Sequence, residues 1–271
     1  MSSLIPTRHV YFSITSDNPF IPDWYVKQLR DDLDPKLAMR MLDGIWLEIG
    51  TDVIYHAFKT ENNFRDYDYV IELTQPIYLA FDFNISLGKP MSMCLSQYLP
   101  HKDEFHFFNE AIVEGASTEE LCEEIAGRGL LDYDTNYIVH GDATGGARSS
   151  KSKSSDYDLI SKCLANYRNP NGQKLDYRVD VPASNPPVRK RHNLVNAYCK
   201  NANGKSRLFI YRPCKTLLEG MRLTCLRKGG SYVEDDSKHY QHVTTALGYH
   251  VLRCHNQRDI NKPRATLRNI R

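Results

Sequence analysis

Three strand-like runs follow one another between residues 77 and 113, and they constrain the fold more than any other feature. They read IYLAFDFNISL (77–87), MSMCLSQYL (91–99) and EFHFFNEAIV (104–113), and the turn-forming stretches GKP and PHKD separate them. Connections this short join antiparallel neighbours. The sequence therefore predicts an antiparallel meander of three strands.

Helical and strand-like segments alternate after this meander. A capping-box pattern at Ser117 and Glu120 predicts a helix over about 118–128, and NYIVHGD (136–142) is a fourth strand. Further helices are predicted over 156–167, 187–204, 214–223 and 239–254, and further strands over 176–182 and 206–212. Such alternation favours parallel strands with helices on their faces. We expect an α/β fold in which three antiparallel strands precede parallel ones.

The two ends of the chain differ from this alternating region. Residues 1–65 carry prolines at early helix positions and apolar residues at helical spacing, which predicts a small helical segment. Residues 256–271 form a basic tail that we expect to be disordered. The region between them, 66–255, is expected to form the main α/β domain.

The distribution of charge is more informative than its sum of +2. Residues 1–142 hold 10 Lys and Arg against 24 Asp and Glu, a net charge of −14, and residues 143–271 hold 25 against 9, a net charge of +16. A basic half favours a polyanionic partner, because phosphate backbones are bound mainly through Lys and Arg. Mutual neutralisation of the two halves across the fold is the alternative.

Composition excludes several other classes of protein. With 41% hydrophobic and 25% charged residues the chain is an ordinary globular protein. Its longest apolar runs fall short of the roughly 20 residues that a membrane span needs, and its first 20 residues lack a signal-peptide layout. Seven cysteines occur without any CxxC spacing. We expect a cytosolic protein with reduced thiols and no membrane contact.

Two aspartates stand where buried strands are expected. Asp82 shares one face of the first strand with Tyr78, Ala80 and Asn84, and Asp142 ends the fourth strand before a loop of small residues. If a crossover helix returns the fourth strand to the first, the two carboxylates converge and repel unless a divalent cation lies between them. A pair of such ions can cleave phosphodiesters. Ordinary hydrogen bonds to nearby loops are the alternative.

Several stretches together suggest a family. AFDFNISLGKP contains Asp82, HGDATGGARSSKSKSSDYDLI contains Asp142, and VPASNPPVRKRHNLVNAYCKNANGKSRLFIYRPCKTLLEGM is the most distinctive portion. Over most of its length the chain resembles the C-terminal half of the large terminase subunit of tailed bacteriophages, specifically its ribonuclease H-like nuclease domain. TSDNPFIPDWYVKQL through RMLDGIWLEIGTDVIYHAF resembles the segment that joins the ATPase to that nuclease.

The resemblance implies a ribonuclease H-like mixed sheet and a metal-dependent endonuclease that cuts concatemeric double-stranded DNA when packaging starts and ends. It implies two Mg²⁺ or Mn²⁺ ions, and as partners the terminase ATPase domain, the small terminase subunit and the portal. The expected location is the host cytoplasm, transiently at the procapsid portal. No G-x-x-x-x-G-K-[ST] motif occurs, so the ATPase would belong to a separate chain or have been removed.

The chain departs from the family near its last predicted helix. The family usually has a pattern like H-x-S-D-A-L-G-Y there, whereas this chain has HVTTALGY, with His242 present and Thr245 in place of the third aspartate. The resemblance therefore assigns Asp82, Asp142 and His242 to catalysis. Glu234, Asp235 or Asp236 is expected to supply the missing acid, with Asp236 chosen as a metal ligand beside Asp82, Asp142 and His242.

Basic residues after the second aspartate and at a helix start are candidates for DNA backbone contacts: Arg148, Lys151, Lys153, Arg189, Lys190 and Arg191. Glu110 is either an additional ligand or, more simply, a solvent-facing edge residue. His239 and His242 are half of a possible zinc site without a matching second half.

Two other functions stay open. One is a different ribonuclease H-like nuclease, such as a junction resolvase. The other is a DNA-binding docking module of the packaging motor whose catalysis has weakened through loss of the third aspartate.

Overall fold

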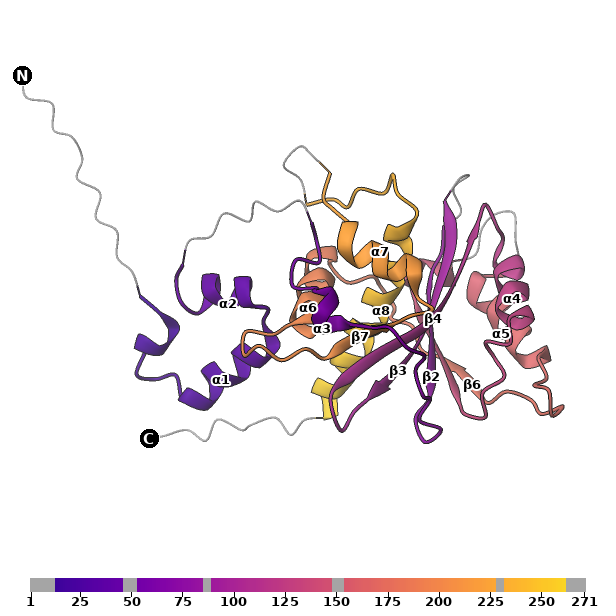
Figure 1. Ribbon diagram of the computed structural model, residues 1–271, viewed down its shortest axis with the longest axis horizontal. Helices are drawn as coiled ribbons and strands as arrows, with labels where there is room; N and C mark the ends of the chain where they lie inside the picture. Colours follow the sequence, from indigo (N-terminus) through magenta and orange to yellow (C-terminus); the bar gives the residue numbers. More distant parts are fainter. Residues whose placement is uncertain (1–12, 46–52, 85–88, 148–153, 228–231, 262–271) are drawn as a thin grey trace, which may run out of the picture.

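The computed structural model describes residues 13–45, 53–84, 89–147, 154–227 and 232–261. A seven-stranded sheet of order β1-β7-β4-β3-β2-β5-β6 lies at its centre (Figure 1). Neighbours β2, β3 and β4 are antiparallel and all other neighbouring pairs are parallel, so the expected mixed sheet is confirmed. The strands are β1 (Phe64–Arg65), β2 (Ile77–Asp82), β3 (Pro90–Leu99), β4 (Glu104–Glu114), β5 (Tyr137–Gly141), β6 (Tyr177–Val179) and β7 (Leu208–Tyr211).

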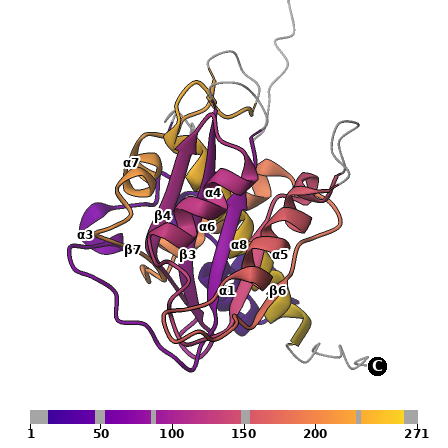
Figure 2. The same ribbon diagram turned by 90° about the vertical axis from the view of Figure 1, so that its right-hand side faces the viewer.

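Helices cover both faces of this sheet (Figures 1 and 2). One face carries α4 (Thr118–Gly127) and α5 (Asp156–Asn166), and both helices begin with the capping box that their sequences encode. The other face carries α6 (Val188–Cys199), α7 (Lys215–Leu223) and α8 (Tyr240–Asn261). Helix α8 continues beyond its expected end at 254, so the first part of the segment predicted to be a disordered tail is helical. Residues 262–271 lie outside the described residues.

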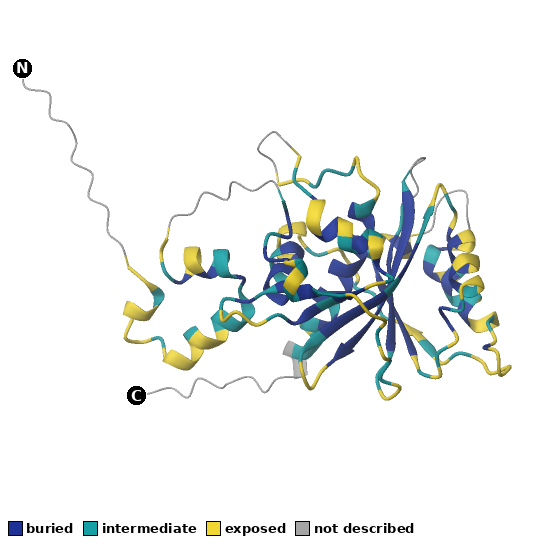
Figure 3. Cartoon of the chain, in the orientation of Figure 1, coloured by how far each residue is buried: buried dark blue, intermediate teal, exposed yellow. Residues whose placement is uncertain are grey.

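Alternation along β2 divides its side chains between two hydrophobic cores. Tyr78 and Ala80 pack in the core under α6, α7 and α8, whereas Ile77, Leu79 and Phe81 pack in the core under α4 and α5. The central strands β2 and β3 are accordingly buried on both faces (Figure 3). The face of β2 that also carries Asp82 is therefore the face covered by α8, as the alternation predicts.

The N-terminal part is helical in its described residues, with η1 (Thr15–Asp17), α1 (Asp23–Asp32), α2 (Pro35–Met41) and α3 (Thr60–Asn63). Helices α1 and α2 lie beside the sheet domain and are largely exposed or half-buried (Figure 3). Residues 54–58, by contrast, belong to the core beneath α8, and β1 pairs with β7. The sheet domain therefore includes residues that the sequence groups with the helical segment.

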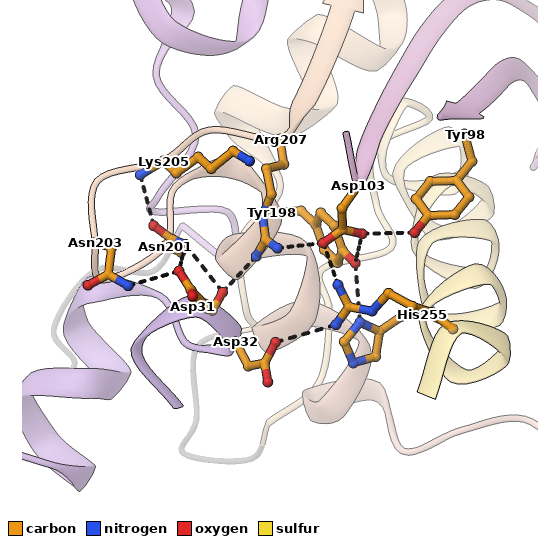
Figure 4. A network of polar contacts seen from close by, with 11 residues as sticks. Asp31, Asp32, Tyr98, Asp103, Tyr198, Asn201, Asn203, Lys205, Arg207 and His255 are labelled. Carbon is orange, nitrogen blue, oxygen red and sulfur yellow. Dashed lines mark hydrogen bonds and ion pairs between the residues drawn. The ribbon is translucent and has the colours of Figure 1, made fainter. Parts of the chain in front are cut away.

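A network centred on Asp103 holds α1 against the sheet domain (Figure 4). The Asp103 carboxylate accepts hydrogen bonds from Tyr98 and Tyr198 at 2.9 Å each and from Arg207 at 2.6 Å, and it is also paired with Arg258. Arg207 in turn donates to the backbone carbonyl of Asp31 at the end of α1, at 2.6 Å.

The seven cysteines are free thiols, as the sequence predicts.

The environment of Glu110 differs from one of its two expected roles. The residue was expected to be a ligand or to face solvent, and the solvent-facing interpretation is wrong, because Glu110 is 7% exposed. Its carboxylate accepts hydrogen bonds from the backbone N–H groups of Thr216 and Leu217 at the start of α7. No helix within the described residues is both long and apolar enough to cross a bilayer.

Candidate active site

The pairing of β2 with β5 brings Asp82 and Asp142 to adjacent positions. The two strands are parallel, and their last registered pair is Phe81 with Gly141. Asp82 and Asp142 each come next along their strands, where neighbouring backbones lie about 4.8 Å apart. Ala80 and His140, two residues earlier, form a register pair, so the two aspartates stand on the same side of the sheet as that pair, the side covered by α8.

Asp82, Asn84 and His242 bring three polar atoms together at the end of β2. Nδ1 of His242 lies 3.1 Å from Oδ2 of Asp82 and 2.8 Å from Nδ2 of Asn84, and Nδ2 of Asn84 lies 3.1 Å from the same Asp82 oxygen. His242 is in the first turn of α8 and is 4% exposed, and Asp82 is 6% exposed. The three side chains thus form a compact, largely buried triangle.

These separations fit a small divalent cation. Ligands at about 2.1 Å from Mg²⁺ in octahedral geometry lie about 3.0 Å from one another. The carboxylate oxygen of Asp82 and, with its amide rotated, the side-chain oxygen of Asn84 suit Mg²⁺ or Mn²⁺, whereas the imidazole nitrogen of His242 is a ligand of transition metals and so favours Mn²⁺ over Mg²⁺. Asp82, Asn84 and His242 could therefore hold one ion.

Asp142 is held by a different set of contacts, which keep it beside this triangle. Its Oδ1 accepts hydrogen bonds from the backbone N–H of Thr144 at 2.7 Å and from Nδ2 of Asn185 at 2.5 Å. The Tyr157 hydroxyl donates to the Asp142 backbone carbonyl at 2.7 Å. Gly145 is required in the loop that follows, because a Cβ there would collide with the Phe83 ring. The small residues after Asp142 thus allow the loop to close over β2.

The pKa values of Asp82 and Tyr249 reflect the charges around the site. Burial raises the pKa of Asp82, and the hydrogen bond and charge of His242 oppose that rise. Tyr249, two turns beyond His242 on α8, has its pKa raised to about 12, mainly by burial, and the negative charges of Asp142 and Asp82 both add to the rise. Both carboxylates therefore lie near enough to Tyr249 to affect its pKa.

Searches of known proteins bear on the fold of this arrangement. No protein-family profile and no curated protein sequence matches the chain at a significant level. The large terminase from a thermophilic bacteriophage matches with a TM-score of 0.57 and 14% identity, over 88% of this chain and 54% of that chain. The nuclease domain of the P22 large terminase matches with a TM-score of 0.54 and 14% identity, over 79% of this chain and 100% of that domain.

The chain has the ribonuclease H-like fold of large terminase nuclease domains. This confirms, for the fold, the resemblance expected from the sequence. The chain spans about half the length of the large terminase from the thermophilic phage. A more distant match, with a TM-score of 0.42 and 11% identity over 71% of this chain and 97% of that one, is the SPP1 large terminase nuclease domain with bound Mn.

In this terminase nuclease fold, Thr245 lies against Glu234. Oγ1 of Thr245 is 3.5 Å from Oε2 of Glu234, and Gln241 donates to the same oxygen at 3.0 Å. The other carboxylate oxygen, Oε1, is 2.7 Å from Arg191 and 2.5 Å from His192. Glu234 is thus an acid in contact with Thr245, the position where the resemblance leads one to expect an aspartate, but its other oxygen is held in an ion pair with Arg191.

The neighbouring acids are placed differently. Asp236, predicted from the sequence to be a metal ligand, is paired with Lys89 at 2.6 Å and with Arg227. Asp235 accepts a hydrogen bond from the backbone N–H of Ser237. No contact joins Asp236 to Asp82, Asp142 or His242 in the described part of the chain, so the structure does not bring this predicted ligand to the others.

The residues predicted to contact DNA fall into three groups. Arg189 and Lys190 are exposed at the start of α6, which suits contact with a phosphate backbone. Arg191 is 3% exposed, is paired with Glu234 and lies over the Tyr249 ring at 4.7 Å, so its prediction as a backbone contact is wrong. Arg148, Lys151 and Lys153 lie outside the described residues.

The sequence did not predict that Asn185 belongs to the site, and it did not predict the contact that Asn84 makes there. Asn185, in the loop before α6, both donates to Asp142 and accepts from the backbone N–H of Ala143 at 2.9 Å. Its only signal is its place in PASNPP, a turn-forming stretch. Asn84 was placed on the same strand face as Asp82, which the structure confirms, but its contact with His242 depends on a helix 158 residues away.

Proposed function

We propose that this protein is a divalent-metal-dependent endonuclease that cuts concatemeric double-stranded phage DNA when packaging starts and ends. The observation that carries the proposal is the convergence of Asp82, Asn84 and His242, with Asp142 at the adjacent position of the neighbouring strand. Oxygen-rich sets of this kind suit Mg²⁺ or Mn²⁺, and a pair of ions serves phosphodiester cleavage in many nucleases.

Each side chain has a defined task in this proposal. Asp82, Asp142 and His242 hold the metal, and a bound divalent ion supplies Lewis-acid stabilisation of the charge that develops on the phosphate. Asn84 orients Asp82 and His242 through its amide nitrogen, and with the amide rotated its oxygen would add a further ligand to the ion. Asn185 and the Thr144 N–H fix the Asp142 carboxylate. Water is the attacking nucleophile.

The DNA partner follows from charge. Residues 143–271 carry a net charge of +16, and the exposed Arg189 and Lys190 lie on α6, the helix whose Arg191 pairs with Glu234 beside Thr245. These basic residues would hold the duplex by its backbone with little sequence preference. Action in the host cytoplasm, together with a terminase ATPase domain, the small subunit and the portal, belongs to the same proposal.

The test is nicking of supercoiled plasmid in Mn²⁺. The parent protein should nick, and Asp82→Asn should lower the rate by at least about 10²-fold, because it removes the charge that binds metal at the end of β2. Asp68→Asn is the matched control, since this acid has a side chain that is 70% exposed and is paired with Arg212. Equal rates for the parent protein and Asp82→Asn would refute the proposal.

A second function is favoured by one specific observation. The acid nearest Thr245 is bound by Arg191 and His192, and Asp236 is bound by Lys89 and Arg227. A chain that lacks a third acidic ligand would act as a DNA-binding docking module without cleavage. It would bind duplex DNA with a salt dependence like that of the nuclease, but the parent protein would not nick in Mn²⁺.

A second assay, on four-way junctions and linear duplex in Mn²⁺, separates the terminase role from that of a junction resolvase. A resolvase would cut four-way junctions much faster than linear duplex of the same sequence. The packaging nuclease proposed here should cut the two substrates at similar rates.

A further inference from the structure

A buried cluster of metal-binding side chains lies between β5 and α8, away from the candidate active site. His140, His250 and Cys254 offer ligand atoms that all lie within 4.8 Å of one another, and this is the only such group of His, Cys, Asp and Glu in the part of the chain that the structure describes. The three residues are 1%, 0% and 3% exposed. Two histidines and a cysteine are the donor set of zinc rather than of Mg²⁺.

The separations between the donor atoms suit a tetrahedral ion. Nδ1 of His140 lies 2.9 Å from Nδ1 of His250, and Sγ of Cys254 lies 3.7 Å from Nδ1 of His250. With zinc at about 2.05 Å from nitrogen and 2.3 Å from sulfur, tetrahedral geometry puts two nitrogens about 3.3 Å apart and a nitrogen and a sulfur about 3.6 Å apart. The two separations that involve Nδ1 of His250 are therefore within about half an ångström of those around a zinc ion, and the ligand atoms of all three residues lie within 4.8 Å of one another.

A carboxylate stands behind one of the histidines, as is usual for zinc ligands. Nε2 of His140 lies 3.5 Å from Oδ2 of Asp180, and Arg253 and Gln257 fix that carboxylate. A ligating histidine commonly presents its second nitrogen to a carboxylate, which orients the ring and leaves the first nitrogen for the metal.

Aromatic rings enclose His250 and direct its Nδ1 toward the other two side chains. Its ring is packed against Tyr78, Phe105 and Phe107, with ring centroids 4.5, 5.3 and 5.8 Å away. Its Nδ1 faces Nδ1 of His140 and Sγ of Cys254. A hydrogen bond between the two histidines alone is the competing explanation, and it leaves Cys254 and the convergence on one point without a role.

We propose that His140, His250 and Cys254 form a structural zinc site that fastens α8 to β5. His140 lies two residues before Asp142, and His250 lies eight residues after His242 on the same helix. An ion between them would fix the helix that carries His242 relative to the strand that carries Asp142. The site is separate from the proposed catalytic centre and selects a different class of metal.

The experiment measures metal in the full chain after purification in zinc-containing buffer and then gel filtration with EDTA. We expect about one zinc per chain in the parent protein and in Cys199→Ser, and at least a tenfold lower content in Cys254→Ser. Cys199 is the matched control because it is also a buried helical cysteine in the same core. Asp82→Asn should keep its zinc, because the catalytic residues are not ligands here.

Cobalt gives an independent readout of the same site. Co²⁺ added to the chain freed of zinc should produce a thiolate-to-cobalt absorption band in the near ultraviolet, in the parent protein and in Cys199→Ser but not in Cys254→Ser. Zinc content below about 0.1 per chain in the parent protein would overturn the proposal. Loss of zinc in Asp82→Asn but not in Cys254→Ser would also overturn it, because the ion would then lie at the active site.

Discussion

The carboxylate of Glu234 lies 3.5 Å from the hydroxyl of Thr245, one turn beyond His242 on α8. Glu234 therefore brings a negative charge to the place where the resemblance to terminase nucleases leads one to expect an aspartate. The charge comes from the segment before α8 and is paired with Arg191. Gly248 makes the pairing possible, because a Cβ at that position would lie 2.7 Å from Cδ of Arg191.

The first prediction concerns the stability that this charge supplies. Although burial opposes it, contact with His192 and Arg191 lowers the pKa of Glu234 from 4.5 to about 2. A carboxyl with such a lowered pKa stabilises the folded state by about 3 kcal/mol above pH 4.5, and this stabilisation is lost as the pH falls through about 2. Glu234→Gln should lower the free energy of unfolding in urea at pH 7 by about that amount.

Adding Thr245→Asp to Glu234→Gln provides the control for this prediction. The double variant restores a negative charge beside the same position, so it should be more stable than Glu234→Gln alone. A double variant no more stable than the single one would show that Thr245 does not share the electrostatic environment of Glu234.

The second prediction concerns His242. His242→Ala should reduce Mn²⁺-dependent nicking by about 10²-fold and raise the Mn²⁺ concentration needed for half of the maximal rate, because in the proposed site the imidazole, 3.1 Å from Asp82, would be a metal ligand. His239→Ala is the matched control, since His239 is exposed just before α8. Identical metal dependence in the parent protein and in His242→Ala would exclude a ligand role for this histidine.

The third prediction concerns the attachment of α1. Asp103 has a φ of +57°, which Asn also tolerates, and its carboxylate pairs with the buried Arg207. Asp103→Asn should lower the free energy of unfolding by roughly 3 kcal/mol, because it removes the negative charge that is paired with the buried guanidinium of Arg207. It should also speed proteolysis within residues 13–45. The network of Figure 4 contains the control, Asp32→Asn, whose half-exposed pair with Arg258 at 3.4 Å should contribute less than about 1 kcal/mol.

The fourth prediction concerns DNA. Replacing Arg189 and Lys190 together by Gln should weaken binding to duplexes of any sequence and reduce the slope of log K against log salt by about 2, since each phosphate contact contributes about 0.9. Arg212→Gln, at an exposed residue paired with Asp68, should leave the slope unchanged. An unchanged slope in the double variant would place the DNA elsewhere.

The pattern of residues along the chain was enough to predict which strands carry Asp82 and Asp142 and that these strands are neighbours. The period of two along β2 assigned Asp82 and Asn84 to one face, and the helix before β5 indicated a return of the chain to a parallel position beside β2. Both inferences depend on backbone geometry, which short-range sequence encodes well. This is why the adjacency of Asp82 and Asp142 could be expected.

The partners of individual side chains could not be predicted in the same way. Arg191 was expected to face DNA because it stands in a basic run, yet its side chain crosses α8 at Gly248 to reach Glu234. Asp236 was expected to bind the metal, yet its carboxylate forms an ion pair with Lys89, which lies just before β3. The cluster of His140 and His250 joins residues 110 positions apart. Such contacts depend on tertiary packing, so the spacing of residues along the sequence does not predict them.

The central claim is that Asp82 and Asp142 share divalent metal on the face of the sheet beneath α8. Its most direct test is a crystal of this chain soaked in Mn²⁺ and measured for the anomalous scattering of manganese. The account predicts a manganese peak within about 2.3 Å of an Asp82 carboxylate oxygen, with Asp142 bound to the same ion or to a second one about 4 Å away. Manganese bound only at other carboxylates such as Asp236, with none in contact with Asp82, would contradict it.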